Sequence, residues 1–185
     1  MAWCKLFIPL QKEYPQLDVK PERNVKFITS QELEDMYPNY NDKQRENAIT
    51  REYKTVFISQ IGGALKSGKP HDSRAPDYDD WQLNGDILFW HDTLDAPMEI
   101  SSMGIRVDAA TLDNQLTIAG CQNRREKDYH KALLADKLPL TIGGGIGQSR
   151  LSMLLLQKAH VGEVQVSVWD ENTVAGCKNA GIELL

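Results

Sequence analysis

Cysteine is scarce in this sequence, and the few cysteines follow no metal-binding pattern. Cys4, Cys121 and Cys177 are widely spaced and include no CxxC pair, which excludes the common zinc sites and is typical of free thiols in a reducing compartment. Long apolar runs are also missing. The apolar start is interrupted at Pro9, which is atypical of a signal peptide, and no stretch reaches the length of a membrane-spanning helix. These absences predict a cytoplasmic protein with no membrane partner.

Positive charge is not in excess. The 185 residues include 21 Lys and Arg against 26 Asp and Glu, a formal net charge of −5. Proteins that bind nucleic acid generally carry a basic face that neutralises phosphates, so this composition argues against a nucleic-acid partner while allowing a local basic pocket. The apolar fraction of 41% and the length fit one globular domain over residues 1–185.

What the sequence does contain is a glycine-rich run followed by an apolar one. Four of the five residues from Gly143 to Gly147 are glycine, and the apolar stretch after them predicts a helix at about 148–158. A glycine turn lets the backbone approach a ligand, the start of a helix attracts anions, and Arg150 adds a planar cation that suits phosphate. Gln148 breaks the GxGxxG pattern and no Gly-Lys-Ser/Thr follows, so neither common nucleotide motif is present. The alternative is a tight packing turn with a surface arginine.

Local patterns elsewhere predict short strands and helices in mixed order. Thr29 and Glu32 form a capping-box pattern for a short helix that ends before Pro38, and Asn41 or Asp42 is expected to cap the next helix. The other predicted helices are 43–52, 109–119 and 124–136, and the predicted strands are 25–28, 55–58, 86–90, 98–107 and 162–169. The charges at 124–128 are most simply the solvent-facing side of their helix.

A polar segment of 19 residues, 64–82, separates two of the predicted strands. A loop of this length inside a compact domain is usually functional or disordered. Its second half, 71–81, is rich in aromatic residues and paired charges, which predicts a functional loop rather than a linker. The alternative is a solvated acidic loop.

Two carboxylates, Asp86 and Glu99, stand at the outer ends of a predicted hairpin, where antiparallel pairing brings them close. Beside a phosphate-binding arginine they form a candidate Mg²⁺–triphosphate site, because Mg²⁺ prefers carboxylate and phosphate oxygens. Glu99 and Arg106 are seven residues apart, so a regular strand would point them to opposite faces. Both serve one site only if a bulge lies between them, at Ser101–Ser102 or Gly104. The alternative is that Asp86 and Glu99 are strand-edge charges that discourage aggregation.

Four motifs in one order carry a resemblance to a known family. They are Arg74-Ala75-Pro76-Asp77-Tyr78-Asp79-Asp80-Trp81, Leu83-Asn84-Gly85-Asp86-Ile87-Leu88, Glu99-Ile100-Ser101-Ser102-Met103-Gly104-Ile105-Arg106-Val107 and Ile142-Gly143-Gly144-Gly145-Ile146-Gly147-Gln148-Ser149-Arg150. Over about residues 25–170 the chain resembles the ammonia-dependent asparagine synthetases, the aspartate–ammonia ligases of the AsnA type.

The resemblance implies a fold and a reaction. The family is similar to the catalytic domain of class II aminoacyl-tRNA synthetases, which implies an α+β fold with a mainly antiparallel sheet flanked by helices, and a homodimer. It also implies that ATP, assisted by Mg²⁺, activates the side-chain carboxylate of L-aspartate as β-aspartyl-AMP, and that ammonia then displaces AMP.

The resemblance further assigns roles to individual residues. Those expected at the nucleotide and its metal are Arg150 at phosphate, Gly143 and Gly145 at the adenosine, Ile100 at the nucleotide, and Asp86 and Glu99 at Mg²⁺–ATP. Those expected at the amino acid are Ser102 and Arg106, which would contact aspartate and the adenylate, and Asp79, an acidic group near the amino-acid or ammonia site.

The chain also departs from the family pattern. The long N-terminal portion of the family, with its dimer motif and the motif that carries an α-phosphate-binding arginine, has no counterpart here. Residues 1–24 and 170–185 diverge, and Gln82 alone replaces the usual connection between Trp81 and Leu83. We therefore expect the chain to correspond to the C-terminal half of the enzyme. The alternatives are a non-catalytic nucleotide-binding or structural remnant and a tRNA synthetase-like paralogue.

Overall fold

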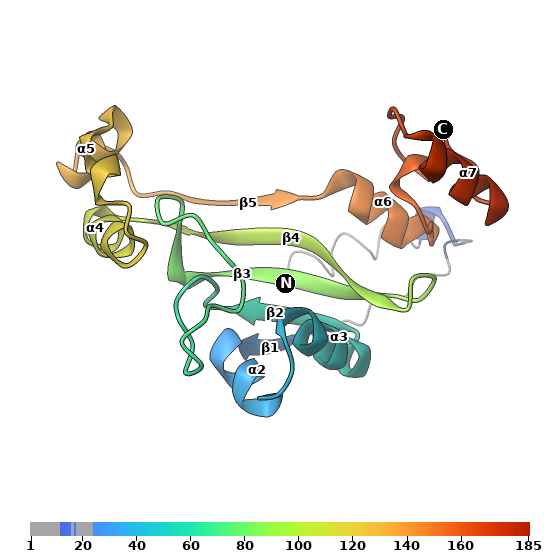
Figure 1. Cartoon of the computed structure of the whole chain (residues 1–185), viewed down its shortest axis with the longest axis horizontal. Coiled ribbons are helices and arrows are strands. Elements are labelled where there is room, and N and C mark those ends of the chain that lie inside the picture. Colours follow the sequence, from blue (N-terminus) through green and yellow to red (C-terminus); the bar gives the residue numbers. More distant parts are fainter. Residues whose placement is uncertain (1–11, 16, 18–23) are drawn as a thin grey trace.

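One five-stranded sheet organises the molecule, which is described here by a computed structural model over residues 12–15, 17 and 24–185. Its strands are β1 (Lys26–Thr29), β2 (Thr55–Ser59), β3 (Asp79–His91), β4 (Ala96–Arg106) and β5 (Ile142–Ile146). They lie in the order β1-β2-β3-β4-β5, with only β1 and β2 parallel. The mainly antiparallel sheet confirms the predicted α+β fold (Figure 1). The predicted divergent segment 1–24 lies largely outside the described residues.

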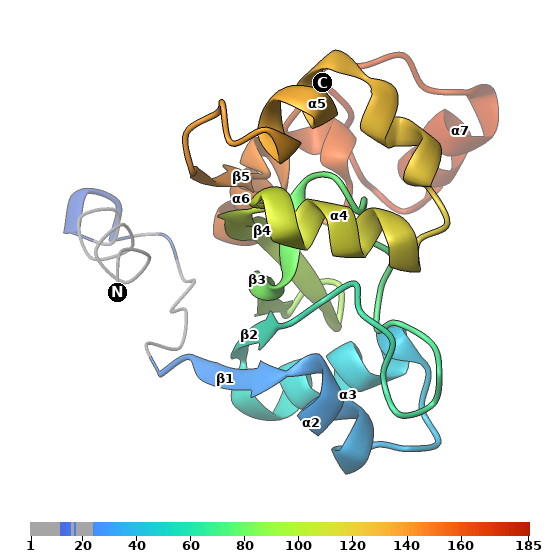
Figure 2. The same cartoon turned by 90° about the vertical axis from the view of Figure 1, so that its left-hand side faces the viewer.

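One helix packs across a face of the sheet, one lies beside β1, and the others lie toward the two ends of the sheet (Figures 1 and 2). They are α2 (Ser30–Met36), α3 (Asp42–Tyr53), α4 (Ala109–Ile118), α5 (Asp128–Leu134), α6 (Gln148–Leu156) and α7 (Glu171–Asn179), with 3-10 turns η1 (Gln122–Glu126) and η2 (Val161–Glu163). None of the described helices is long and apolar enough to cross a membrane.

The first helices begin where their capping patterns predict. The Thr29 hydroxyl accepts a hydrogen bond from the Glu32 amide at 3.1 Å, and the Glu32 carboxylate accepts one from the Thr29 amide at 2.8 Å. Asn41 and Gln44 form the same reciprocal pair at the start of α3. Each pair satisfies amides that the first helical turn leaves unbonded, which confirms both predicted helix starts.

The two faces of the sheet have separate cores. On one face Ile87 and Phe89 of β3 pack with Met153 of α6. On the other face Leu88 packs with side chains of α2 and α3, such as Leu33 and Ile49. Alternate residues of a strand point to opposite faces, so β3 residues with even numbers face α3. A third cluster, between α4 and α5, covers the end of β4.

The glycine-rich run is a strand and not the predicted turn. Gly143 and Gly145 of β5 pair with Gly104 and Ser102 of β4. The prediction was wrong because glycine also permits an extended strand to lie close against the side chains of its neighbour. The predicted helix after this run is confirmed as α6.

Four other predictions need correction. The predicted strand 162–169 is absent, because η2 and irregular backbone occupy it, and Val168 is 96% exposed with no neighbouring strand to pair with. The predicted helix 124–136 is divided into η1 and α5. Arg125 in η1 pairs with Asp113 at 2.6 Å instead of only facing solvent. Finally, β3 already begins at Asp79, inside the predicted loop.

Candidate active site

A bulge in β4 places the predicted site residues on one face of the sheet. Ile87 pairs with Ser101 and Leu88 pairs with Glu99, so Ile100 is the extra residue. This confirms the predicted bulge between Glu99 and Arg106, but its position is Ile100 and not the predicted Ser101–Ser102 or Gly104. After the bulge the side chains alternate in the opposite sense, and Glu99 joins Arg106 on the face toward α3.

Eight of the nine predicted residues lie on this face or reach it. Those on the strands are Asp79, Asp86, Glu99, Ser102, Arg106, Gly143 and Gly145. Arg150, in the first turn of α6, reaches Glu99. Ile100 is different, because its side chain is buried in the core against α6 and its carbonyl accepts a hydrogen bond from the Gly147 amide at 2.8 Å. Its predicted nucleotide contact would therefore involve backbone alone.

At one end of the face, Arg106 is held from several sides. Its guanidinium forms an ion pair with Asp79 and donates a hydrogen bond to the Tyr78 hydroxyl at 2.7 Å. Its carbon Cζ lies 3.8 Å from the centre of the Tyr78 ring, within the range of a cation–π interaction. We call Tyr78, Asp79 and Arg106 the Arg106 cluster.

Two glycines make room for this cluster. A Cβ on Gly143 would lie 3.0 Å from Cζ of Arg106, and a Cβ on Gly104 would lie 2.8 Å from Cγ of Asp79. Around a Cβ on Gly145, in contrast, there would be nothing within 4 Å. The resemblance assigned Gly143 to the adenosine, whereas the geometry gives it a packing role beside Arg106. Sequence reasoning named Gly104 only as a possible bulge position and gave Tyr78 no role, although Tyr78 stands directly before Asp79.

At the other end of the face, Glu99 and Arg150 meet more loosely. Arg150 Nη1 lies 3.5 Å from Glu99 Oε1 and donates to the Glu99 carbonyl at 3.1 Å. Both residues line a cavity of about 430 Å³, together with α3 residues that include Lys43 and Glu46. We call Asp86, Glu99 and Arg150 the Glu99 cluster.

The carboxylates of the Glu99 cluster fit a divalent cation. Burial and the neighbouring Asp86 raise the pKa of Glu99, against the opposing effect of Arg150 and other cations. Asp86 Oδ1 is buried and has no hydrogen-bond partner among the described residues. A cation near both carboxylates would relieve their repulsion and satisfy this oxygen. The described residues contain no group of three or more metal-ligating side chains, so a metal would need further oxygens from a ligand or water.

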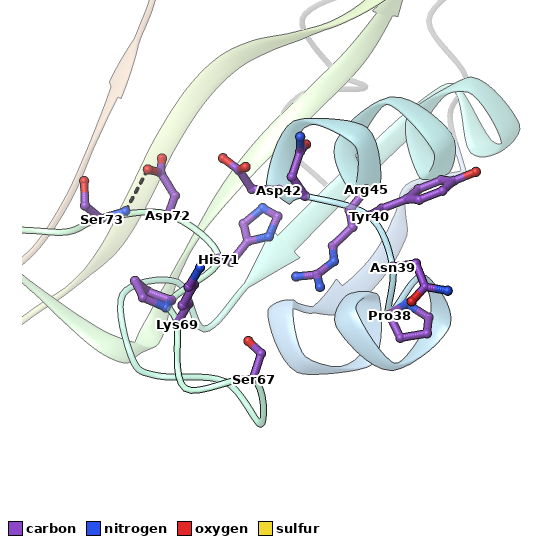
Figure 3. Close-up of a pocket in the computed structure, with 12 residues that line it drawn as sticks. Pro38, Asn39, Tyr40, Asp42, Arg45, Ser67, Lys69, His71, Asp72 and Ser73 are labelled. Atoms are coloured by element: carbon purple, nitrogen blue, oxygen red, sulfur yellow. Dashed lines mark hydrogen bonds between the residues drawn. The ribbon is translucent and has the colours of Figure 1, made fainter.

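A second pocket, which sequence reasoning did not find, lies between the α2–α3 connection and the loop 67–73 (Figure 3). Its volume is about 680 Å³, and the buried side chains of Arg45 and His71 reach into it. His71 Nε2 lies 3.3 Å from Glu46 Oε1, and Arg45 pairs with Glu34 at 3.3 Å. Burial raises the pKa of Glu46, but His71 and Lys43 together lower it by more than burial raises it. The net pKa of Glu46 is therefore below its ordinary value. The His71–Glu46 contact joins the predicted functional loop to α3, and the Arg45–Glu34 ion pair joins α3 to α2.

Several curated proteins similar to this chain are named aspartate–ammonia ligase. The chain is 56% identical over 177 residues to the aspartate–ammonia ligase of Clostridium tetani, covering 95% of this chain and 52% of that protein. It is 58% identical over 175 residues to that of Bacillus cereus strain G9842, with 95% and 54% covered. It is 60% identical over 161 residues to that of Levilactobacillus brevis, with 87% and 48% covered. The chain thus spans about half the length of these curated relatives.

Two solved structures similar to this chain are tRNA synthetases. Aspartyl-tRNA synthetase from Entamoeba histolytica aligns with a TM-score of 0.57 and 19% identity, covering 88% of this chain and 35% of that one. Asparaginyl-tRNA synthetase of the same organism, in complex with asparaginyl-adenylate, aligns with a TM-score of 0.53 and 20% identity, covering 83% and 36%. At this identity the likeness concerns the fold alone, and it confirms the predicted class II synthetase-like fold.

A family model described as aspartate–ammonia ligase matches residues 5–181, a wider range than the motifs cover. With this match and relatives at more than half identity, the chain belongs to the aspartate–ammonia ligase family.

Proposed function

We propose that this chain provides the active-site face for the ATP-dependent ligation of ammonia to L-aspartate, which yields L-asparagine, AMP and diphosphate. The observation that carries the proposal is the convergence of the Arg106 cluster and the Glu99 cluster on one face, through the β4 bulge. Membership of the family and the names of the relatives support it.

The Glu99 cluster is the proposed nucleotide end. Arg150 binds phosphate oxygens, and Asp86 and Glu99 hold Mg²⁺ together with the phosphates. The metal supplies positive charge that neutralises the triphosphate. The open surface at Gly145 leaves space for the adenosine, because no atom lies within 4 Å of where a Cβ would be.

The Arg106 cluster is the proposed amino-acid end. Arg106 binds a carboxylate of aspartate, and the Ser102 hydroxyl, directly opposite Asp86 in the sheet, contacts the aspartate or the adenylate. Asp79 accepts hydrogen bonds from the amino group or from ammonia. Since Asp79 and Tyr78 already fix the guanidinium, little ordering is needed when the substrate binds.

The proposed reaction consists of two displacements. First, an oxygen of the aspartate side chain attacks the α-phosphorus of ATP, the bond from this phosphorus to the bridging oxygen breaks, and diphosphate leaves. Second, the nitrogen of ammonia attacks the activated carbonyl carbon, the bond from that carbon to the AMP oxygen breaks, and nitrogen loses a proton. The residues act mainly by positioning and by stabilising charge.

Homodimer formation, a cytoplasmic location and the absence of nucleic-acid and membrane partners are further proposals. The family resemblance supports the dimer. The acidic composition supports the lack of a nucleic-acid partner, and the unpaired, widely spaced cysteines support a reducing compartment.

The test measures asparagine formed from aspartate, ammonia and Mg²⁺–ATP by the purified chain, alone and mixed with the half of the Clostridium tetani relative that it does not match. We expect weak Mg²⁺–ATP binding and little asparagine from the chain alone, because one missing preorganised donor lowers rates by about 10²–10³-fold. We expect the rate to rise with the added half. No Mg²⁺–ATP binding in either sample contradicts the proposal. Binding without asparagine in both samples favours the alternative, a non-catalytic nucleotide-binding protein.

A further inference from the structure

The loop between β2 and β3 is tied to the helices at both of its ends. Near its start, Lys66 pairs with Asp35 at 2.6 Å. Near its end, Asp77 accepts hydrogen bonds from Arg124 at 3.0 Å and pairs with His130 at 2.9 Å. These anchors restrain the segment between them, in which His71 contacts Glu46 of α3.

From this middle segment Arg74 reaches into the site. Its Nη1 lies 3.0 Å from Asp72 Oδ2, and its Nη2 forms an ion pair with Asp86 Oδ2. Asp72 is fixed in turn, because its Oδ1 accepts a hydrogen bond from the Ser73 amide at 2.7 Å (Figure 3). Asp72, Arg74 and Asp86 therefore form a continuous chain of alternating charge, which we call the Arg74 bridge.

The Arg74 bridge occupies only one oxygen of Asp86. Oδ2 bonds Arg74, whereas Oδ1 is buried and has no hydrogen-bond partner among the described residues. The whole side chain of Asp86 is only 9% exposed. A buried acceptor without a partner is unfavourable, so this oxygen is positioned to accept a ligand.

The charges of the bridge permit a cation at Oδ1. The guanidinium alone would repel a cation, but Asp72 balances its charge at 3.0 Å. Carboxylates that bind metals are commonly held in orientation by hydrogen bonds to their other oxygen. Lysine would not reproduce this arrangement, because only the planar fork of arginine binds two carboxylates in a fixed geometry.

We propose that Arg74 is a positioning residue that orients Asp86 so that Oδ1 faces the metal of Mg²⁺–ATP, and that Asp72 holds Arg74 in place. The inference rests on the proposed function, since it takes Asp86 as a metal ligand. It extends that function to a loop residue to which neither the sequence motifs nor the family resemblance gave a role.

The experiment titrates Mn²⁺ into the full chain with ATP present, by electron paramagnetic resonance, for the wild type, Arg74→Lys and Arg74→Ala. Mutation of outer residues around a metal typically weakens its binding by about 10–100-fold, and we expect a loss in this range for both variants. ATP affinity in excess EDTA should change much less, because the bridge acts through the metal. Asp72→Asn should weaken Mn²⁺ binding in the same direction but less.

A matched control is Arg125→Lys, which alters another arginine–aspartate pair, 2.6 Å long, outside the site. It should leave Mn²⁺ affinity unchanged. Circular dichroism shows whether each variant folds, and Arg74→Lys, which keeps the charge, decides the result if Arg74→Ala does not fold. Unchanged Mn²⁺ affinity in Arg74→Lys overturns the inference, and tighter binding overturns it by making Arg74 a competitor of the metal. If the wild type itself binds no Mn²⁺ with ATP, the proposed metal site fails together with the inference.

Discussion

The two ends of the site face differ in how completely they are formed without a ligand. At the amino-acid end, the side chains of Arg106 and Asp79 are 19% and 6% exposed and form a close ion pair. At the nucleotide end, those of Arg150 and Glu99 are 55% and 38% exposed and lie 3.5 Å apart. One end, which we call the rigid end, is therefore largely formed without a ligand, and in the proposed function the other, the open end, is left to be ordered by the nucleotide.

The cause of this difference lies in the neighbouring backbone. Gly104 and Gly143 let Asp79 and Arg106 sit directly against two strands, where Tyr78 covers the guanidinium. Arg150, in contrast, projects from the first turn of a helix into an open cavity. In the proposed function the rigid end would select the amino acid, whereas the open end would admit a larger and more highly charged ligand.

The largest expected effect comes from removing the rigid end. In the chain mixed with the complementary half of a relative, Arg106→Ala should lower asparagine formation by about 10²–10³-fold, the effect of losing one preorganised charged donor. Arg106→Lys should remain strongly impaired, because lysine cannot bond Asp79 and Tyr78 as a planar fork. Equal rates in the wild type and Arg106→Ala would remove this end from the site.

The next effect concerns the open end. Arg150→Ala should weaken ATP binding by about 1.5–3 kcal/mol, the scale of a hydrogen bond to a charged group, as measured by calorimetric titration. The thermal unfolding midpoint should barely change, because the ion pair of Arg150 with Glu99 is exposed. If ATP affinity stayed the same, Arg150 would not contact phosphate.

A matched pair of glycine substitutions separates the two ends. Gly143→Ala should destabilise the fold by about 1–3 kcal/mol, because the added methyl group displaces the Arg106 guanidinium. Gly145→Ala should change stability much less, since the space there is open, but it should weaken ATP binding. Chemical denaturation and ATP titration measure both variants. Equal destabilisation by the two substitutions would contradict the packing role of Gly143.

The smallest expected effect is a pH dependence of the folding stability at Asp77, which lies next to the rigid end. Burial raises the pKa of Asp77, but the hydrogen bonds from His130 and Arg124 lower it by more than burial raises it. The net pKa of Asp77 is therefore below its ordinary value. A carboxyl group of this kind stabilises the fold above its unfolded-state pKa and loses the effect as pH falls through the folded-state pKa. Asp77→Asn should cost about 1 kcal/mol at neutral pH and should flatten the stability curve below about pH 4. Unfolding measured between pH 2 and 7 checks this, and a mutant curve parallel to the wild type would speak against it.

The features that sequence predicted correctly depend on local rules. Capping pairs that span four residues start α2 and α3. The odd spacing of Glu99 and Arg106 predicted a bulge on the condition that both serve one site, and the structure has a bulge between them. The strand β5 and the missing strand at 162–169 were predicted wrongly, because a strand depends on whether a distant neighbour is available to pair with it. For the same reason no sequence pattern indicated that Arg74 would meet Asp86.

The most direct test of the central claim is a titration of the ¹⁵N-labelled chain with Mg²⁺–ATP, followed by the amide signals of both ends in NMR spectra. The account predicts large shifts at Glu99, Gly145 and Arg150, and small shifts at Tyr78 and Asp79. Shifts of similar size at both ends, or shifts confined to Tyr78 and Asp79, would contradict a nucleotide end that is open and an amino-acid end that is already formed.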